Sequence, residues 1–266
     1  MLDIKNVTKI FAKGTPNEHK ALDNLSLRLD AGDFVTIVGS NGAGKSTLFN
    51  AICGTFFVDT GRIVLDNTDI TYTKEHKRSR MIGRVFQDPM KGTSPNLTIE
   101  ENIALAYSRS KHSPLKMALN KKDVNYFREM LSGFGMGLED RLDTKVGLLS
   151  GGQRQVVTLL MCTIVPPKLL LLDEHTAALD PATSQKIMEI TNEIVRKHNL
   201  TTLMITHNIN SALKTGNRTI MMDSGKVILD ISGEERDKMN LNDLLEMYSK
   251  RSNKVFDNDR MLLGGE

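Results

Sequence analysis

Apolar and polar residues alternate along two segments near the N-terminus, 2–11 and 22–29, as in strands buried on one face. In the first segment Leu2 and Ile4 are expected to face a core, while Asp3 and Lys5 face solvent. The four leucines at 169–172 instead predict a strand buried on both faces, as parallel sheets require. Further strands are expected at 34–38, 61–66, 82–86, 203–206, 219–222 and 227–231. The turn residues at 223–226 predict that the last two form a hairpin.

The spacing of apolar residues predicts helices at 47–52, 124–131 and 181–198. Another helix should begin after Thr98, because Glu101, three residues later, completes a capping box. From about 90 to 167 the pattern favours helices and no strand, with a break at 110–114. We therefore predict an α/β core at 1–238, a helical subdomain inserted into it at about 90–167, and a short helix with a polar tail at 239–266.

The segment 39–47 matches the phosphate-loop pattern G-x-x-x-x-G-K-[ST], between a predicted strand and a predicted helix. Three glycines let the backbone approach an anion closely, and the following helix turns its positive end toward the same anion. Lys45 would bind the β- and γ-phosphates and Ser46 would offer a hydroxyl to Mg²⁺. The alternative is a glycine-rich turn that matches by chance. The loop residues are Gly39, Ser40, Asn41, Gly42, Ala43, Gly44, Lys45, Ser46 and Thr47.

Two acidic residues follow the four leucines. Asp173 ends the predicted strand, where a carboxylate can hold Mg²⁺ through water. Glu174 comes next and is a candidate general base for a water molecule attacking a triphosphate. An ordinary polar strand end is the alternative interpretation, and the phosphate loop makes it much weaker.

The segment 149–153 predicts a second helix N-terminus of the anion-binding kind. Ser150 is a good N-cap, and Gly151 and Gly152 allow a close approach of the backbone before a helix from Gln153 to Cys162. One chain would then carry two phosphate-binding helix ends, which suggests that a phosphate is gripped from two sides, by two chains. A structural Ser-Gly-Gly turn is the alternative.

Composition narrows the possible functions. The net charge is +3 over 266 residues, with both signs mixed, so we expect no nucleic-acid partner. Cys53 and Cys162 lie in apolar surroundings without metal-ligand spacing, and we interpret both as small buried hydrophobic residues. The N-terminus lacks an apolar signal-peptide segment, and no apolar run approaches the roughly 18 residues that span a bilayer. Any membrane role is expected to come through a partner.

The ordered motifs resemble the ATP-binding cassette (ABC) family over about residues 2–231. Residues 39–47 are similar to its Walker A loop, Gln87 to its Q-loop glutamine and 149–153 to its signature. Residues 169–173 are similar to its Walker B strand, and Glu174 occupies the place of its catalytic carboxylate. Three further positions match its D-loop, its switch histidine and its adenine-stacking aromatic: Asp180, His207 and Phe11.

The resemblance implies an α/β fold: a P-loop NTPase (RecA-like) core with an antiparallel β subdomain and an inserted α-helical subdomain. It also implies a head-to-tail dimer, either a homodimer or a pair with another ATPase subunit, that encloses two ATP molecules with Mg²⁺. Catalytic roles would fall to Glu174, His207, Gln87 and Lys45, and metal binding to Ser46, Gln87 and Asp173. The opposite chain would contribute its signature, Ser150, Gly151, Gly152 and Gln153.

The function implied by this resemblance is that of an ATPase subunit of an ABC transporter. The subunit would energise uptake of a small molecule, such as an amino acid, through a separate membrane permease. It would lie at the cytoplasmic face of the cell membrane, and an extracellular substrate-binding protein is expected in the same system. Two alternatives stay open: a non-transport ABC ATPase of the translation or DNA-repair type, and a nucleotide-dependent binding protein without turnover.

Two positions depart from the usual family pattern. Phe11 replaces the more common tyrosine, which keeps a stacking face and drops a hydroxyl. His175 occupies a position where proline or alanine is common, and we interpret it as a surface or loop residue without a catalytic role.

Overall fold

The computed structural model describes residues 1–108 and 121–252, which form two compact units. Unit 1 contains Met1–Ile82 and the chain from Leu200 onward, and unit 2 contains Gly83–Asn199. The break expected at 110–114 and most of the polar tail lie outside the described residues. None of the helices in the two described ranges has both the length and the apolar character needed to cross a bilayer.

An antiparallel sheet in unit 1 has the strand order β2-β1-β4-β5. Its strands are β1 (Leu2–Phe11), β2 (His19–Leu29), β4 (Thr60–Leu65) and β5 (Thr68–Asp69). Leu2 pairs with Leu29 on one side and with Leu65 on the other, and all three side chains are fully buried. The alternating pattern at 2–11 therefore predicted the strand and its buried face correctly.

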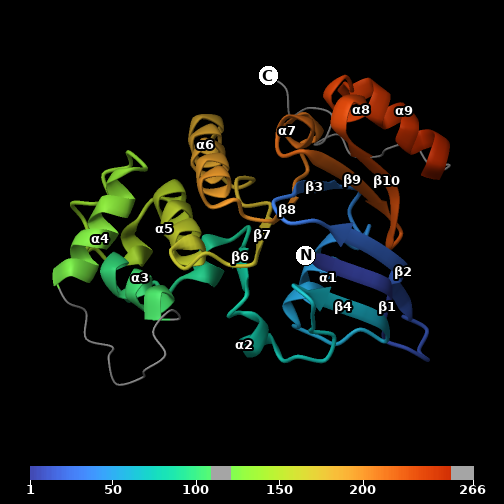
Figure 1. Ribbon diagram of the computed structural model, residues 1–266, viewed down its shortest axis with the longest axis horizontal. Helices are drawn as coiled ribbons and strands as arrows, with labels where there is room; N and C mark the ends of the chain where they lie inside the picture. The colour runs from blue at the N-terminus through green and yellow to red at the C-terminus, as the bar shows by residue number, and fades with distance from the viewer. Residues whose placement is uncertain (109–120, 253–266) are drawn as a thin grey trace. The chain divides into compact units, whose positions relative to one another are not determined.

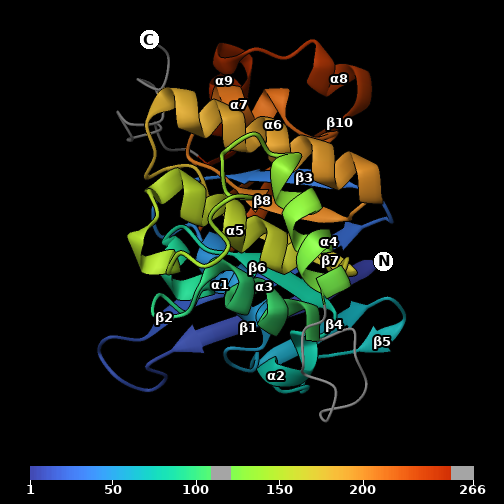
Figure 2. The ribbon, with the colours of Figure 1, turned by 90° about the vertical axis from the view of Figure 1, so that its left-hand side faces the viewer.

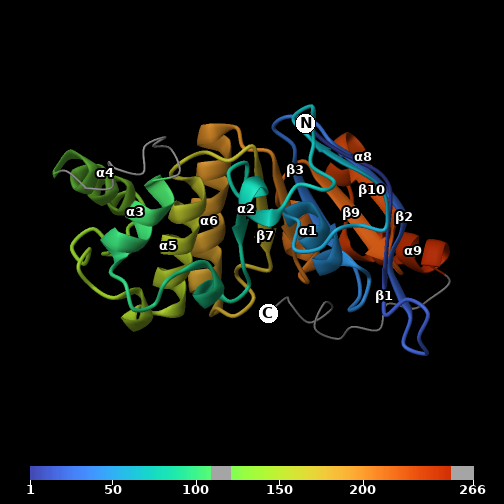
Figure 3. The same cartoon turned by 90° about the horizontal axis from the view of Figure 1, so that it is seen from below.

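A mostly parallel sheet makes up the rest of the core of unit 1 (Figure 1). β3 (Phe34–Val38) runs parallel to β8 (Thr202–Ile205) on one side and to β9 (Arg218–Asp223) on the other. β10 (Lys226–Ser232) is antiparallel to β9 and lies beside β2 (Figure 3). The hairpin between β9 and β10 turns at Ser224 and Gly225, whose φ angles of 49° and 77° are those of a type I′ turn. This confirms the predicted hairpin.

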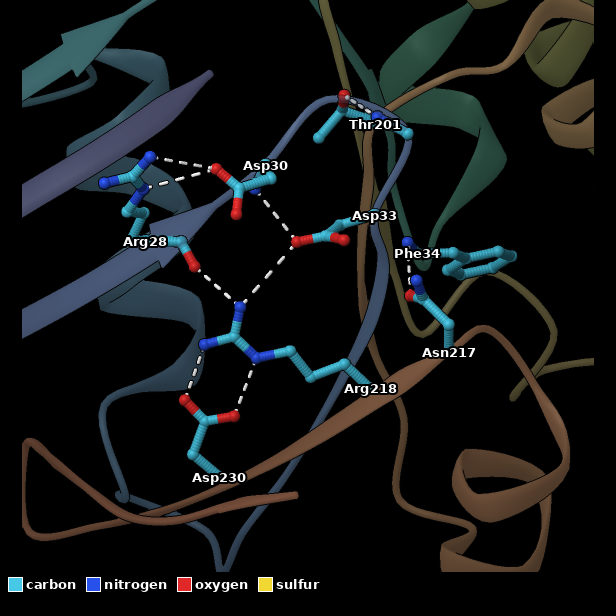
Figure 4. Close-up of polar contacts among 9 residues, drawn as sticks. Arg28, Asp30, Asp33, Phe34, Thr201, Asn217, Arg218 and Asp230 are labelled. Carbon is cyan, nitrogen blue, oxygen red and sulfur yellow. Dashed lines mark hydrogen bonds and ion pairs between the residues drawn. The ribbon is translucent and has the colours of Figure 1, made fainter. Parts of the chain in front are cut away.

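Polar contacts fix the start of β3 against β9 and β10 (Figure 4). Arg218 donates to both carboxylate oxygens of Asp230, at 2.7 and 2.5 Å, and to the carbonyl oxygen of Arg28 at 2.7 Å. The hydrogen bonds to Asp230 raise the pKa of Arg218. The backbone N–H of Phe34, the first residue of β3, donates to Asn217 Oδ1 at 2.9 Å. These contacts hold the strand that leads into the phosphate loop.

Helices cover the sheets of unit 1. They are α1 (Lys45–Cys53), α2 (Glu75–Arg78), α7 (Ile209–Lys214), α8 (Gly233–Asp237) and α9 (Leu241–Ser252). Leu244 and Tyr248 of α9 pack into a core cluster with Val38 and Met221 of the parallel sheet. Figure 2 shows α7, α8 and α9 together at one end of unit 1.

Within the described residues, unit 2 contains two strands and most of the helical positions. Its strands are β6 (Ile82–Val85), whose first residue is the last of unit 1, and β7 (Leu169–Asp173), with all four leucines fully buried. Its α-helices are α3 (Ile99–Tyr107), α4 (Lys121–Ser132), α5 (Gly151–Thr163) and α6 (Pro181–His198). The described part of unit 2 also includes the short 3₁₀ helices η1 (Pro89–Gly92), between β6 and α3, and η3 (Val146–Leu148), between α4 and α5. The bounds of the inserted subdomain stay a prediction.

The capping box predicted at the start of α3 is confirmed. The Glu101 backbone N–H donates to Thr98 Oγ1 at 3.1 Å, and the Thr98 backbone N–H donates to the Glu101 carboxylate at 2.7 Å. Asn102, in the same helix, is fully buried and donates through its amide to the carbonyl oxygens of Ser94 and Thr98. These bonds anchor the chain that enters the helical part of unit 2.

Arg78 caps the C-terminus of α1, the helix that follows the phosphate loop. Its guanidinium is 1% exposed and donates to the carbonyl oxygens of Ala51 and Ile52 at 2.8 Å each. Two more bonds reach Thr71 and Thr73 carbonyl oxygens, at 2.9 and 2.7 Å. A cation at this position also interacts favourably with the negative end of the helix dipole.

We expect Arg78→Met to lower the free energy of unfolding by about 3 kcal/mol, since buried carbonyl groups lose their donors. Arg80, two residues later, is exposed, so Arg80→Met should change it by less than about 0.5 kcal/mol. Urea unfolding followed by circular dichroism measures both. Equal unfolding midpoints for the two variants would contradict the capping role.

Candidate active site

The phosphate loop connects β3 to α1, as the sequence predicts. Gly44 is the N-cap of α1 and has a φ of 98°, in the left-handed region. A Cβ at Gly44 would lie 2.6 Å from the Ala21 carbonyl oxygen, and one at Gly39 would lie 2.3 Å from the Met222 carbonyl oxygen. At both positions another backbone approaches too closely for any side chain. Gly39 and Gly44 are therefore required by neighbouring segments as well as by the loop itself.

Lys45 is buried, and its charge is held within the loop. Its Nζ donates to the carbonyl oxygens of Gly39 at 2.6 Å and Ser40 at 3.0 Å. Ser46, the next residue, is exposed at the N-terminal end of α1. A phosphate bound in this loop would meet the lysine charge, the N–H groups of the loop and the positive end of the helix.

The turn of the β9–β10 hairpin is hydrogen-bonded to the phosphate loop. The Gly225 N–H donates to the Ala43 carbonyl oxygen at 3.0 Å, and the Gly225 carbonyl oxygen accepts from the Asp23 N–H at 3.0 Å. The turn thus links the loop to β2. The sequence signalled the hairpin by its turn residues, but it carried no signal for this contact.

His207 follows β8 and lies at the same edge of the parallel sheet as the phosphate loop. β8 runs parallel to β3, and the Thr206 N–H donates to the Ile37 carbonyl oxygen at 3.1 Å. His207 is half-buried. Phe11, at the end of β1, keeps 39% of its surface exposed and makes an edge contact with Phe56, with ring centroids 5.3 Å apart.

Asp173 ends β7 in unit 2, and it is ion-paired. Its Oδ2 accepts from Arg84 Nη2 at 2.7 Å, and the Arg84 guanidinium lies 4.7 Å from the Phe86 ring centroid. Sequence reasoning missed Arg84. The available signal was a single cation within the apolar strand that precedes Gln87. Gln87 is exposed just after β6.

Glu174 stands at a sharp turn after β7. Its φ of 49° lies in the left-handed region, which is unusual for a residue with a side chain. Its carbonyl oxygen accepts from the Ala177 N–H at 3.0 Å, which closes a turn over the next three residues. The side chain is half-buried.

His175 is a loop residue, as predicted, but the alternative that it lies on the surface is wrong. The side chain lies in the turn but is only 2% exposed, and its Nε2 lies 3.1 Å from Thr191 Oγ1 of α6. Burial lowers its pKa from 6.5 to about 4, so the imidazole is neutral near pH 7. A histidine in a polar turn gives no periodic signal of burial, because the group that accepts it is 16 residues away.

The signature segment starts α5 with the predicted N-cap. The Gln153 N–H donates to Ser150 Oγ at 3.2 Å, and the Ser150 N–H donates to Gln153 Oε1 at 3.3 Å, which forms a capping box. A Cβ at Gly152 would lie 2.3 Å from Thr183 Cγ2, so the first turns of α5 and α6 are in close contact.

Asp180 caps α6. Its Oδ1 accepts from the Thr183 N–H at 3.0 Å, and this hydrogen bond lowers the pKa of Asp180. The D-loop residue is therefore fixed by its own helix, and it is exposed to solvent.

The three residues predicted to bind Mg²⁺ carry oxygen atoms of a suitable chemical kind. Ser46, Gln87 and Asp173 offer a hydroxyl, an amide and a carboxylate, all oxygen ligands of the kind this ion prefers. Ser46 belongs to unit 1, and the other two belong to unit 2. A single carboxylate suffices in such sites, because phosphates and water complete the octahedral shell.

Gly44→Ala should weaken ATP binding by at least about 10-fold, because the added methyl group displaces the loop from Ala21. Gly233 provides a matched control, since its φ is 60° and a Cβ there would meet nothing within 4 Å. Gly233→Ala carries similar backbone strain at the start of α8, outside the predicted site, so its affinity should stay within about twofold. Titration calorimetry with ATP measures both, and equal losses would contradict the steric explanation.

Comparison with known proteins supports the resemblance to the ABC family that the sequence motifs indicate. The family described as ABC transporter matches residues 22–177. The chain is 46% identical, over 93% of its length and 98% of the relative's, to the tyrosine transport ATP-binding protein of Clostridioides difficile (strain R20291). It is 34% identical, over 86% of its length and 64% of the relative's, to a methionine import ATP-binding protein of Histophilus somni (strain 129Pt).

Solved structures with the same fold are ATP-binding cassettes. One is a dimeric cassette in a post-hydrolysis state bound to ADP and Pi, with a TM-score of 0.75 and 30% identity over 87% of this chain and 98% of that one. Another is a cassette of an ABC transporter in its ADP conformation, with a TM-score of 0.76 and 30% identity over 93% and 98%. The chain therefore belongs to the ABC transporter family, as one of its ATP-binding, ATP-hydrolysing cassettes.

Proposed function

We propose that this cassette drives uptake of an amino acid through a separate membrane permease. The observation that carries the proposal is the 46% identity, over nearly the whole chain, to a tyrosine transport ATP-binding protein. The similarity to a methionine import ATP-binding protein supports the same substrate class. The cassette would sit at the cytoplasmic face of the membrane, bound to the permease, with an extracellular substrate-binding protein delivering the amino acid.

Hydrolysis would use the residues described above in separate roles. Lys45 binds the β- and γ-phosphates, Gln87 and His207 contact the γ-phosphate region, and Glu174 accepts a proton from the attacking water. Ser46, Gln87 and Asp173 would hold Mg²⁺, which neutralises phosphate charge when bound. Arg84 would orient the Asp173 carboxylate through their 2.7 Å ion pair.

Two cassettes would close head to tail around two ATP molecules. The loop of one chain would bind a nucleotide whose γ-phosphate meets Ser150, Gly151, Gly152 and Gln153 of the other chain. The capped N-terminus of α5 supports this role, since it presents backbone N–H groups and a positive helix end. ATP has a γ-phosphate that both chains would contact, and ADP lacks it. Hydrolysis would therefore remove the contacts that favour the closed dimer, and the two chains would separate.

Glu174→Gln should lower the ATP hydrolysis rate by about 10²–10⁴-fold and leave ATP affinity within about threefold, because the base is lost and the shape is kept. In the assembled transporter the same variant should abolish uptake of labelled tyrosine. Glu193→Gln, at an exposed position of α6, is the matched control and should leave both activities unchanged. If the Glu174→Gln transporter lost hydrolysis but still took up amino acids at the normal rate, this cassette would not drive amino-acid uptake.

A mixture of two inactive variants tests the shared site. Lys45→Ala disables the loop of one chain, and Ser150→Arg disables the signature of the other. A mixed dimer still contains one complete site, made from the intact loop of the second chain and the intact signature of the first. We expect ATPase activity of the mixture to exceed the sum of the separate variants at least about fivefold, since each homodimer lacks both sites and loses about 10²-fold or more. Strictly additive activity would exclude a site shared between chains.

A further inference from the structure

The turn after β7 contains a buried hydrogen bond that the roles above do not use. His175, directly after Glu174, is 2% exposed, and its Nε2 lies 3.1 Å from Thr191 Oγ1. Thr191 is itself fully buried in the middle of α6. A polar pair buried this deeply must be satisfied internally, because no water can replace a lost partner.

The direction of this hydrogen bond follows from the second contact of the hydroxyl. Thr191 Oγ1 donates to the Ile187 carbonyl oxygen at 2.7 Å, which uses its only proton. The hydroxyl can therefore only accept from His175, so the imidazole carries its proton on Nε2. His175 thus donates to Thr191, and Thr191 donates to the backbone of α6.

This bond fixes one end of a strained turn. Glu174 has a φ of 49°, which a residue with a side chain keeps only where its surroundings enforce it. On one side β7 holds it through four fully buried leucines. On the other side the turn is held by the Ala177 N–H, at 3.0 Å from the Glu174 carbonyl oxygen, and by the His175 side chain bonded to α6.

We propose that His175 is a positioning residue for ATP hydrolysis. Its hydrogen bond to Thr191 holds Glu174 in the left-handed conformation that aims the carboxylate at the attacking water. The proposal rests on the role of Glu174 as general base. A small displacement of such a group is enough to slow the reaction, since a misplacement of about 1 Å can cost about 10²-fold.

The competing explanation is that His175 and Thr191 merely fill the core between the turn and α6. In that case their replacement lowers stability, and the hydrolysis rate measured well below the melting temperature is unchanged. A positioning role instead lowers kcat and leaves KM for ATP unchanged, because the phosphate loop that binds the nucleotide is not altered.

The test compares variants of Thr191 with a matched threonine. Thr191→Val removes the acceptor and keeps the shape, whereas Thr191→Ser keeps the hydroxyl. Thr163 of α5 is an equally buried threonine whose Oγ1 donates to the Leu159 carbonyl oxygen at 2.8 Å, four residues back, as Thr191 does. Thr163→Val therefore controls for a buried hydroxyl lost from a helix elsewhere in unit 2.

We expect Thr191→Val to lower kcat by about 10-fold with KM within about twofold, equivalent to about 1.4 kcal/mol of transition-state stabilisation. Thr191→Ser should keep kcat within about twofold of that of the unmodified protein. Thr163→Val should also keep kcat within about twofold of that value. His175→Phe removes the donor from the other end, fills the space and should reproduce the loss, which keeps the test valid if Thr191→Val does not fold.

The outcomes separate this proposal from the role of Glu174. If Glu174→Gln abolishes hydrolysis while Thr191→Val and His175→Phe keep a normal kcat, positioning by His175 is excluded. If Thr191→Ser is as slow as Thr191→Val, or Thr163→Val is equally slow, packing explains the effect and the proposal is overturned. If Glu174→Gln itself hydrolyses ATP normally, the general-base assignment fails instead.

Discussion

The close approach of three backbones around Gly44 is the constraint on which the phosphate loop depends. β2 reaches it at Ala21, the β9–β10 turn reaches it at Gly225, and α1 begins at the residue that follows it. A hydrogen bond between Gly225 and Ala43 fixes their separation. The glycines that let a phosphate approach thus also let strands from distant parts of the chain press against the loop, so binding and folding require the same residues.

Two buried arginines, Arg78 and Arg236, stabilise the ends of helices in unit 1 by donating to backbone carbonyl oxygens. Arg78 donates to carbonyl oxygens at the C-terminus of α1, and Arg236 donates to those of Ala212 and Thr215, at the C-terminus of α7. Burial lowers the pKa of both guanidinium groups, whereas the negative ends of the two helix dipoles favour the charged form. One of these helices starts at Lys45 and the other starts two residues after His207, so both arginines support elements next to the site.

Local patterns predicted the strands, the hairpin and the helix caps well, because each depends on residues a few positions apart. Thr98 and Ser150 are N-caps as expected, since a capping box needs only four consecutive residues. The sequence did not predict the buried or paired side chains whose partners lie far away along the chain. His175 lies in a polar turn, and Arg84 is one cation in an apolar strand, and nothing within ten residues of either reveals Thr191 or Asp173.

Helix α6 connects functions that belong to different sites of the proposed dimer. Its N-terminus is capped by Asp180 and touches the start of the signature helix through Thr183 and Gly152. Two turns later the same helix accepts the hydrogen bond of His175, beside Glu174. One helix of 18 residues therefore packs both against the start of the signature helix, at Thr183, and against the turn that holds the proposed base, at Thr191. A change of packing at α6 is thus expected to affect both segments, because both rest on the same helix.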